Sequence, residues 1–213
     1  MAMSLTLYGS RGSGSAAIEM ALRAAGLDHR LVRASSWEPD SAQDELRQVN
    51  PLGQIPTLVL EHDGQRTVLT ESAAILIHLG LEHPAAGLLP GDAAGRALHL
   101  RGLVYIAANC YSAVSISDFP QQWTQDSRPE AVEAVRLAAR AKLHRHWELF
   151  ADLFGTALHA EPPGALAFLA VVVSQWSGAR AHLAAQRPDF HRRLMALQAH
   201  PRLAPTLAEH RPA

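Results

Sequence analysis

An apolar residue followed by proline, Ile55-Pro56, stands directly before a run with β-strand character at residues 57–61. Proline has no N–H to donate and is normally excluded from the interior of a strand. A cis peptide bond would place it at the start of the strand, because X-Pro bonds tolerate the cis form and other bonds almost never do. That geometry turns the N–H and C=O of Ile55 outward. The sequence therefore predicts a strand entrance where the main chain can pair with a peptide-like ligand.

An acidic and a hydroxyl residue, Glu71 and Ser72, stand where the hydrophobic pattern changes from strand to helix. Free N–H groups and the positive end of the helix dipole attract a carboxylate to a helix N-terminus. The alternative is a capped surface helix with Ser72 near its start. Together with Ile55-Pro56, the pair predicts a site for a small peptide that carries both an amine and a carboxylate.

The combined run NPLGQIPTLVL and LTESAAIL, residues 50–60 and 69–76, resembles the glutathione-binding half of the cytosolic glutathione S-transferase family. The opening segment LTLYGSRGSGSAAIEMALRAAGL is similar to the first strand and helix of that family. The resemblance covers the whole chain and implies a bacterial-type member of a serine-like rather than a tyrosine or cysteine class. It also implies a two-fold homodimer, for which the helix from Ala94 and residues 62–69 are the candidate contact segments.

The periodicity of apolar residues predicts an α+β thioredoxin-like domain, with a mixed four-stranded sheet and helices, followed by an all-α helical bundle. Strands are predicted over residues 4–8, 29–33, 57–61 and 67–69, and helices over 16–25, 40–49, 72–81, 94–114, 129–154, 165–183, 189–198 and 203–208. Asp63-Gly64 predicts a hairpin turn. Proline and glycine between residues 83 and 92 indicate a linker. We therefore expect a glutathione-binding domain, a linker and a helical domain at residues 1–82, 83–93 and 94–213.

Composition limits the partners. The chain has 213 residues and a formal net charge of −1, which disfavours nucleic acid as a partner. The longest apolar run, residues 165–173, is too short to cross a bilayer. The single cysteine, Cys110, excludes an internal disulfide, and with no secretion signal we expect a cytoplasmic protein without a membrane partner. The histidines lack the spacing of a metal site, so we expect no metal.

Glutathione chemistry requires the ligand's sulfur as a thiolate, because the thiol itself is a poor nucleophile. A hydroxyl that donates to the sulfur near a helix N-terminus lowers the pKa of the thiol. The hydroxyl residues of the first strand and the following loop are the candidates: Tyr8, Ser10, Ser13 and Ser15. Tyr8 follows Leu7 on the opposite face of the strand. From the residues alone, the thiolate stabiliser stays open among these hydroxyls.

The resemblance ranks these serines. Tyrosine-class enzymes place their catalytic residue at the position of Leu7, and the beta class places a cysteine at the position of Gly14. The phi- and theta-like serine classes place their serine at Ser13. We therefore predict Ser13 as the catalytic residue, with Ser15 and Ser10 as the alternatives. A serine before a helix is also a common N-cap, and Ser13 can serve as both.

The resemblance also implies the remaining contacts of glutathione, the co-substrate. Glu71 would hold the ammonium and Ser72 the carboxylate of the γ-glutamyl end, while Ile55, before Pro56, would pair with the cysteinyl unit. Gln54 would reach the ligand backbone or its glycine end. The glycine carboxylate needs a cation or an amide donor, and the sequence leaves three candidates open: Arg33, Trp37 and Gln43.

A small hydrophobic electrophile, the second substrate, is expected between the domains, against the long helix from Ala94. Its candidate contacts are Tyr105, Tyr111 and Trp123. Tyr111 matches a position where beta-class enzymes carry a histidine, so its phenol could donate to a developing anion. A tyrosine packed on the core is the alternative.

Two further features concern stability and fold. Cys110 is expected to be a buried apolar residue. The family's capping box at the central helix is missing, so Pro162-Pro163-Gly164 is expected to start that helix instead.

Three functions compete. The first is a glutathione transferase, with isomerase, dehalogenase and ether-cleaving variants. The second is a non-catalytic interaction or ligand-carrier protein with the same fold, which predicts a decayed ligand site. A thiol–disulfide oxidoreductase would need a cysteine in the first loop, and residues 9–15 contain none.

Overall fold

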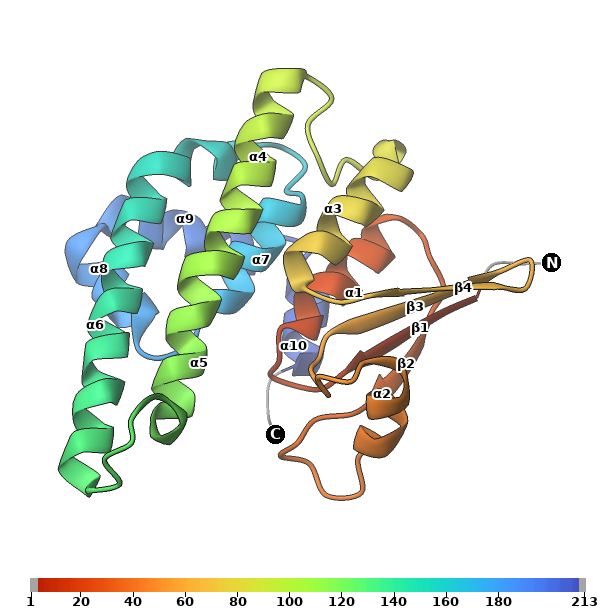
Figure 1. Cartoon of the computed structure of the whole chain (residues 1–213). Helices are drawn as coiled ribbons and strands as arrows, with labels where there is room; N and C mark the ends of the chain where they lie inside the picture. The colour runs from red at the N-terminus through yellow and green to blue at the C-terminus, as the bar shows by residue number, and fades with distance from the viewer. Residues whose placement is uncertain (1–3, 211–213) are drawn as a thin grey trace.

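The computed structural model describes residues 4–210, so the outer ends of both predicted domains lie outside the described residues (Figure 1). The N-terminal part is thioredoxin-like and consists of β1 (Ser4–Gly9), α1 (Ser15–Ala24), β2 (Arg30–Arg33), α2 (Gln43–Val49), β3 (Thr57–His62), β4 (Gln65–Leu69) and α3 (Ser72–Glu82). The rest is helical: η1 (Pro84–Ala86), α4 (Ala93–Tyr105), η2 (Ile106–Tyr111), α5 (Ser112–Asp118), η3 (Pro120–Trp123), α6 (Pro129–Phe154), η4 (Gly155–His159), α7 (Ala165–Val173), α8 (Ala179–Gln186), α9 (Pro188–Gln198) and α10 (Ala204–His210).

The four described strands form a mixed sheet in the order β2-β1-β3-β4. β1 runs parallel to β2 and antiparallel to β3, so the sheet is mixed, as predicted. Leu5 and Leu7 join the main core beside α1 and α3, whereas Tyr8 packs with Leu46 of α2 in a separate cluster. Both faces of the sheet are therefore covered, and α1 and α3 lie between the sheet and the helical part (Figure 1).

The hairpin between β3 and β4 confirms the turn prediction. Asp63 and Gly64 both have positive φ, 49° and 78°, as a type I′ turn requires. β4 begins at Gln65, two residues before the predicted start. The helix predicted from residue 40 begins only at Gln43, because Asp40 has a left-handed φ of 56° that a helix cannot include.

The helix predicted over residues 94–114 is longer and less regular than expected. α4, η2 and α5 follow one another without a break as far as Asp118, and η2 is a π-helical segment. Side chains give the local carbonyls additional partners there: Asn109 Nδ2 donates to Tyr105 O at 3.1 Å, and Ser112 Oγ donates to Ala108 O at 2.7 Å. The wider turn changes the direction of the side chains that follow it, and π-helical turns are frequent at functional sites.

The prediction of one continuous helix over residues 165–183 is wrong, because the chain leaves the helix at residues 174–178 and resumes it as α8. α7 ends at Val173, and Ser177 and Gly178 have φ values of 53° and 77°, which stop a right-handed helix. Arg180 satisfies the end of α7 by donating to Val171 O at 2.9 Å and to Ser174 Oγ at 2.7 Å. The interruption leaves a turn at residues 174–178 beside the cavity described below.

The start of α7 also differs from expectation, because neither Pro162 nor Pro163 belongs to the helix. Instead, Ala165 N donates to Leu88 O at 2.9 Å, so the segment before α4 replaces the missing cap. A Cβ at Gly164 would lie 2.5 Å from Leu88 O, and only glycine permits this approach. α7 itself is buried along its whole length, as predicted.

Candidate active site

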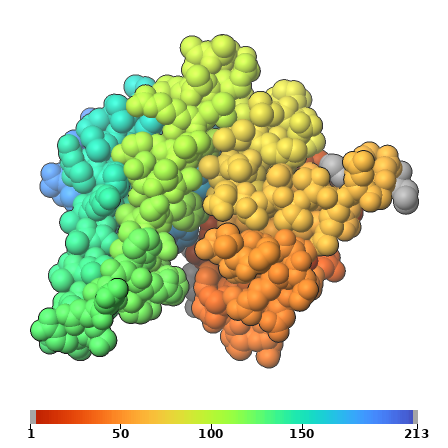
Figure 2. All heavy atoms as spheres, in the orientation of Figure 1, coloured from red at the N-terminus to blue at the C-terminus, as the bar shows by residue number. Residues whose placement is uncertain are grey.

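A cavity of about 820 Å³ lies between the N-terminal part and the helices (Figure 2). The surface is hollowed there, between the orange segment after β2 and the green helix that contains α5. The N-terminal part contributes Gly12, Ser13, Gly14, Ala34, Ser35, Ser36, Trp37, Asn50, Gly53, Gln54, Ile55, Pro56, Thr70, Glu71 and Ser72. The helical part contributes Ala107, Tyr111, Ser112, Val114, Ser115, Asp118, Phe119, Trp123, Trp176 and Ser177.

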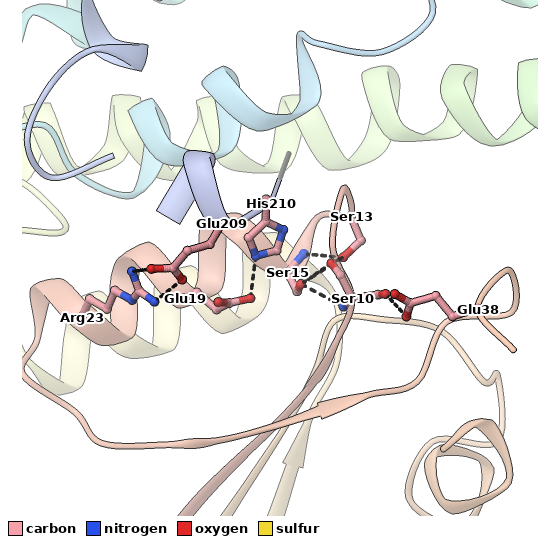
Figure 3. A network of polar contacts seen from close by, with 8 residues as sticks. All are labelled: Ser10, Ser13, Ser15, Glu19, Arg23, Glu38, Glu209 and His210. Carbon is pink, nitrogen blue, oxygen red and sulfur yellow. Dashed lines mark hydrogen bonds and ion pairs between the residues drawn. The ribbon is translucent and has the colours of Figure 1, made fainter. Parts of the chain in front are cut away.

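The three candidate serines form one hydrogen-bonded network after β1, but they differ in access to the cavity (Figure 3). Ser13 lines the cavity, whereas Ser10 and Ser15 are buried behind it. The Ser13 and Ser15 hydroxyls lie 2.9 Å apart, and Ser15 N donates to Ser13 Oγ at 3.2 Å just before α1 begins. Of the three hydroxyls, that of Ser13 is placed to meet a ligand.

The Ser13 hydroxyl can turn toward a ligand without leaving a buried acceptor unsatisfied. It donates to Ser10 O at 2.7 Å, and the Ser15 hydroxyl donates to the same carbonyl at 3.2 Å. If the Ser13 proton turns into the cavity, Ser15 still satisfies this carbonyl. The N–H of Ser10 donates to Ser15 Oγ at 3.2 Å and holds that residue in place.

Ser10 makes a different connection. Its hydroxyl donates to the Glu38 carboxylate, which also accepts from Ser35 Oγ at 2.7 Å. The bond from Ser10 is the main reason why the pKa of Glu38 lies below its ordinary value. Because its proton is already committed to a carboxylate, Ser10 is the least suited of the three to donate to a sulfur.

The side-chain amide of Asn50 holds the loop that carries Ile55-Pro56. The Ile55-Pro56 bond is cis, as predicted, and Gln54, Ile55 and Pro56 all line the cavity. Asn50 Nδ2 donates to Gln54 O and to Thr57 Oγ1, both at 3.0 Å. Asn50 thus positions the segment that we expect to contact a peptide ligand.

Glu71 and Ser72 meet at the start of α3, on the same cavity. Glu71 has φ 63° and ψ 113°, an uncommon backbone conformation for a residue with a side chain. Such conformations concentrate at ligand sites, where the surrounding structure maintains them. Ser72 is the first residue of α3, so the positive end of that helix dipole faces the cavity.

Tyr111 approaches this site from the helical side. A Cβ at Gly14 would lie 2.2 Å from Tyr111 Oη, so a side chain at residue 14, where the beta class has cysteine, would collide with the phenol. Burial raises the pKa of Tyr111 to about 12, and the adjacent Ser72 hydroxyl opposes the shift. Within residues 4–210 the Tyr111 hydroxyl has no hydrogen-bond partner of normal geometry. It therefore keeps its proton and is free to donate.

Comparison with known proteins agrees with this geometry. Residues 15–81 match the family model described as glutathione S-transferase, N-terminal domain. The chain is 33% identical over 141 residues to the uncharacterized GST-like protein YncG of Escherichia coli K12, covering 66% of each chain. The chain belongs to the glutathione S-transferase family.

Two further proteins show how much of the chain and of its fold is shared with known relatives. The chain is 37% identical over 92 residues to a probable maleylacetoacetate isomerase of Caenorhabditis elegans, covering 43% of this chain and 39% of that protein. The matched region thus spans about two thirds of the length of the YncG protein and 39% of that of the isomerase. A glutathione transferase homolog from Sulfitobacter, solved with bound glutathione, has a TM-score of 0.76 at 23% identity and covers 97% and 98% of the two chains. That similarity establishes the shared fold.

Not every residue predicted from the glutathione S-transferase resemblance reaches the cavity. Tyr105 does not line it: its ring packs against Phe150 and Phe154, and its hydroxyl lies 3.3 Å from His146 Nδ1. Trp123 lines the rim with 59% of its surface exposed. Tyr8 points away, as predicted, and donates to Glu45 Oε1 at 2.7 Å.

Among the candidates for the glycine carboxylate, Trp37 lines the cavity, whereas Arg33 and Gln43 do not. Cys110 is buried as predicted, and burial raises the pKa of its thiol to about 12. The residue is therefore an inert apolar one in this glutathione S-transferase family member.

Sequence analysis missed several residues of the cavity. Trp176 and Ser177 lie there because α7 ends early, inside a stretch that reads as one helix. Asp118 and Phe119 lie there because the helix from Ala93 extends past its predicted end. Of these missed residues, only Asn50 could have been found from the local sequence, because an Asn-Pro pair before a turn is typical of a loop that an asparagine side chain organises.

No helix within residues 4–210 is both long and apolar enough to span a membrane. The same part of the chain contains no cluster of three or more histidine, cysteine, aspartate or glutamate side chains arranged to hold a metal ion.

Proposed function

We propose that this chain is a serine-class glutathione transferase that activates the thiol of glutathione for attack on a small hydrophobic electrophile, in a transfer or isomerisation reaction. One observation carries the proposal: Ser13, Ile55-Pro56 and Glu71-Ser72 come from three separate segments and line one cavity. The non-catalytic alternative predicts that these groups decay or disperse. Residues 1–82 would bind glutathione, and residues 94–213 would complete the electrophile site.

Each group has a defined task in this mechanism. The Glu71 carboxylate binds the γ-glutamyl ammonium, and Ser72 with the free N–H groups of α3 binds the adjacent carboxylate. The main chain of Ile55 pairs with the cysteinyl unit in strand fashion. The Ser13 hydroxyl donates to the sulfur beside the start of α1, where the helix dipole also favours a negative charge. Both effects lower the pKa of the thiol, and its proton leaves to solvent.

The thiolate then attacks the electrophile. A carbon–sulfur bond forms, and the electron pair of the broken bond leaves with the leaving group or moves onto an activated substrate atom. Negative charge develops on that group or atom. The protonated Tyr111 hydroxyl, which makes no hydrogen bond of normal geometry within residues 4–210, would donate to it.

Calorimetric titration with reduced glutathione, together with the thiolate absorbance of the complex as a function of pH, tests the proposal. We expect binding and a thiol pKa well below that of free glutathione. Binding without a lowered pKa would favour the ligand-carrier alternative. Absence of binding at millimolar glutathione would refute the transferase proposal.

Glu71→Gln is expected to raise the Kd of glutathione about thirtyfold, since a hydrogen bond between charged groups contributes about 2 kcal/mol. The uncharged amide keeps the shape of the side chain and loses only the attraction for the ammonium. Titration calorimetry of the two proteins measures the effect. Glu82→Gln is the matched control, because it removes the same charge at the exposed far end of α3. Equal affinities in wild type and Glu71→Gln would exclude the assigned role.

A further inference from the structure

The cavity of this protein has an unusual balance of charge. Only two of its lining residues are charged, Glu71 and Asp118, and both are acidic. Within residues 4–210, no arginine, lysine or histidine lines it. Under the proposed function Glu71 is neutralised by the ammonium of glutathione, so Asp118 remains as the charged side chain that faces a second substrate.

Aromatic rings form much of the remaining wall. Trp176 packs edge-to-face on Tyr111 with ring centroids 5.6 Å apart. Phe119, Trp123 and Trp37 also line the cavity and are 47%, 59% and 61% exposed. Apolar rings of this size are rarely left exposed together on one concave surface unless a ligand covers them. Their faces attract cations as well as flat apolar groups.

Asp118 lines the same cavity as these rings and has no close partner within residues 4–210. Within the described part of the chain, no hydrogen bond or ion pair is made by its carboxylate. The nearest cations, Arg136 and Arg140, donate to the main chain and hydroxyl of Ser117 at 3.2 and 3.3 Å and do not line the cavity. Burial raises the pKa of Asp118, and the two guanidinium groups oppose the shift.

The position of Asp118 is also unfavourable for the helix. It is the last residue of α5, at the negative end of the helix dipole, where a cation would be stabilising and a carboxylate is not. Asp118 is exposed at the cavity and has no protein partner within the described residues, so its carboxylate is available to a ligand that supplies the opposite charge.

We propose that the electrophile site selects aromatic substrates that carry a cationic group and excludes those that carry a carboxylate, with Asp118 as the residue that sets this preference. The inference rests on the proposed function for the reaction, but the charge preference belongs to the cavity itself. A carboxylate-bearing substrate would meet Asp118 with no cation to compensate. A quaternary or protonated amine would meet one carboxylate and several ring faces.

Binding of unreactive probes tests the charge preference without any catalysis. Benzyltrimethylammonium and phenylacetate are titrated separately, and the fluorescence of the cavity tryptophans reports binding. We expect the cation to bind more tightly, and Asp118→Asn to lower the ratio of the two affinities about tenfold. Asp28→Asn, which removes an exposed carboxylate outside the cavity, is expected to leave the ratio unchanged. A ratio that Asp118→Asn leaves within a factor of two, or tighter binding of phenylacetate, would overturn the proposal.

Turnover of substrates that differ in charge tests whether the same charge preference governs the reaction. The substrates are benzyl chlorides with a para trimethylammoniomethyl, methyl or carboxymethyl group, each rate being divided by its uncatalysed rate with free glutathione. The thiolate forms the bond to the benzylic carbon and chloride leaves with the electron pair. In wild type we expect the normalised rate to be highest for the cationic substrate, intermediate for the neutral one and lowest for the anionic one. In Asp118→Asn we expect most of the difference among the three rates to disappear. If the probes show the preference but no chloride is turned over, the proposed function fails while the assignment of Asp118 is supported.

Discussion

Ser13→Ala is expected to lower kcat/KM for glutathione-dependent turnover about a hundredfold and to raise the pKa of the bound thiol. Removing one preorganised donor from a developing anion typically has an effect of this size. The affinity for glutathione should change little, because Glu71, Ser72 and Ile55 hold the rest of the ligand. Steady-state kinetics measures kcat/KM. The thiolate absorbance of the glutathione complex as a function of pH measures the pKa of the bound thiol.

The neighbouring serines provide the comparison for Ser13. Ser15→Ala removes the acceptor of Ser10 N, so it should reduce stability as well as activity. Ser4→Ala, at the far end of β1, controls for the loss of a serine hydroxyl and should leave turnover unchanged. If Ser13→Ala keeps full activity while Ser15→Ala or Ser10→Ala loses it in a folded protein, the thiolate role belongs to that neighbour.

His210→Ala is expected to lower the free energy of unfolding by about 3 kcal/mol, the largest effect on stability that we expect from one side chain near the site. His210 Nε2 lies 2.7 Å from Glu19 Oε1, and the two residues are 8% and 3% exposed. Without the imidazole, the Glu19 carboxylate would remain buried on α1 with no partner. Urea denaturation followed by circular dichroism measures the loss.

The adjacent pair of Arg23 and Glu209 is the matched control for this prediction (Figure 3). It joins the same two helices, but its side chains are 43% and 54% exposed. Water screens such a pair, so Glu209→Gln should cost less than about 1 kcal/mol. Adding Glu19→Gln to His210→Ala should recover part of the lost stability, because the uncompensated charge is then gone. Equal losses for His210→Ala and Glu209→Gln would contradict this account.

The features that sequence analysis predicted correctly depend mostly on interactions between residues close together in the sequence. The cis Ile55-Pro56 bond, the Asp63-Gly64 turn and the start of α3 after Glu71 each depend on a few consecutive residues. The mixed character of the sheet follows from the pattern of apolar residues and the element order, whereas the strand order comes from the structure. Ser13 was ranked first by resemblance, and the geometry independently distinguishes it from Ser10 and Ser15 because it alone of the three lines the cavity.

The errors share a different cause. The stretch of apolar residues from Ala165 onward is typical of one helix. Its pattern does not predict that Ser177 and Gly178 adopt a left-handed conformation. The π-helical segment that ends at Tyr111 likewise has no counterpart in the sequence pattern. Local propensity differs little between these alternatives, so the packing of the surrounding helices decides between them.

The sequence by itself determined the class of fold, the strand entrance at Pro56 and the residue types available to a glutathione site, because these follow from backbone sterics and the periodicity of burial. Only the tertiary structure decided which of those residues face the cavity. Gly14 lies against Tyr111, Glu19 pairs with His210, and Leu88 replaces the cap of α7. Such contacts connect residues far apart in the chain, and their free energy is gained only when the whole core has closed around them.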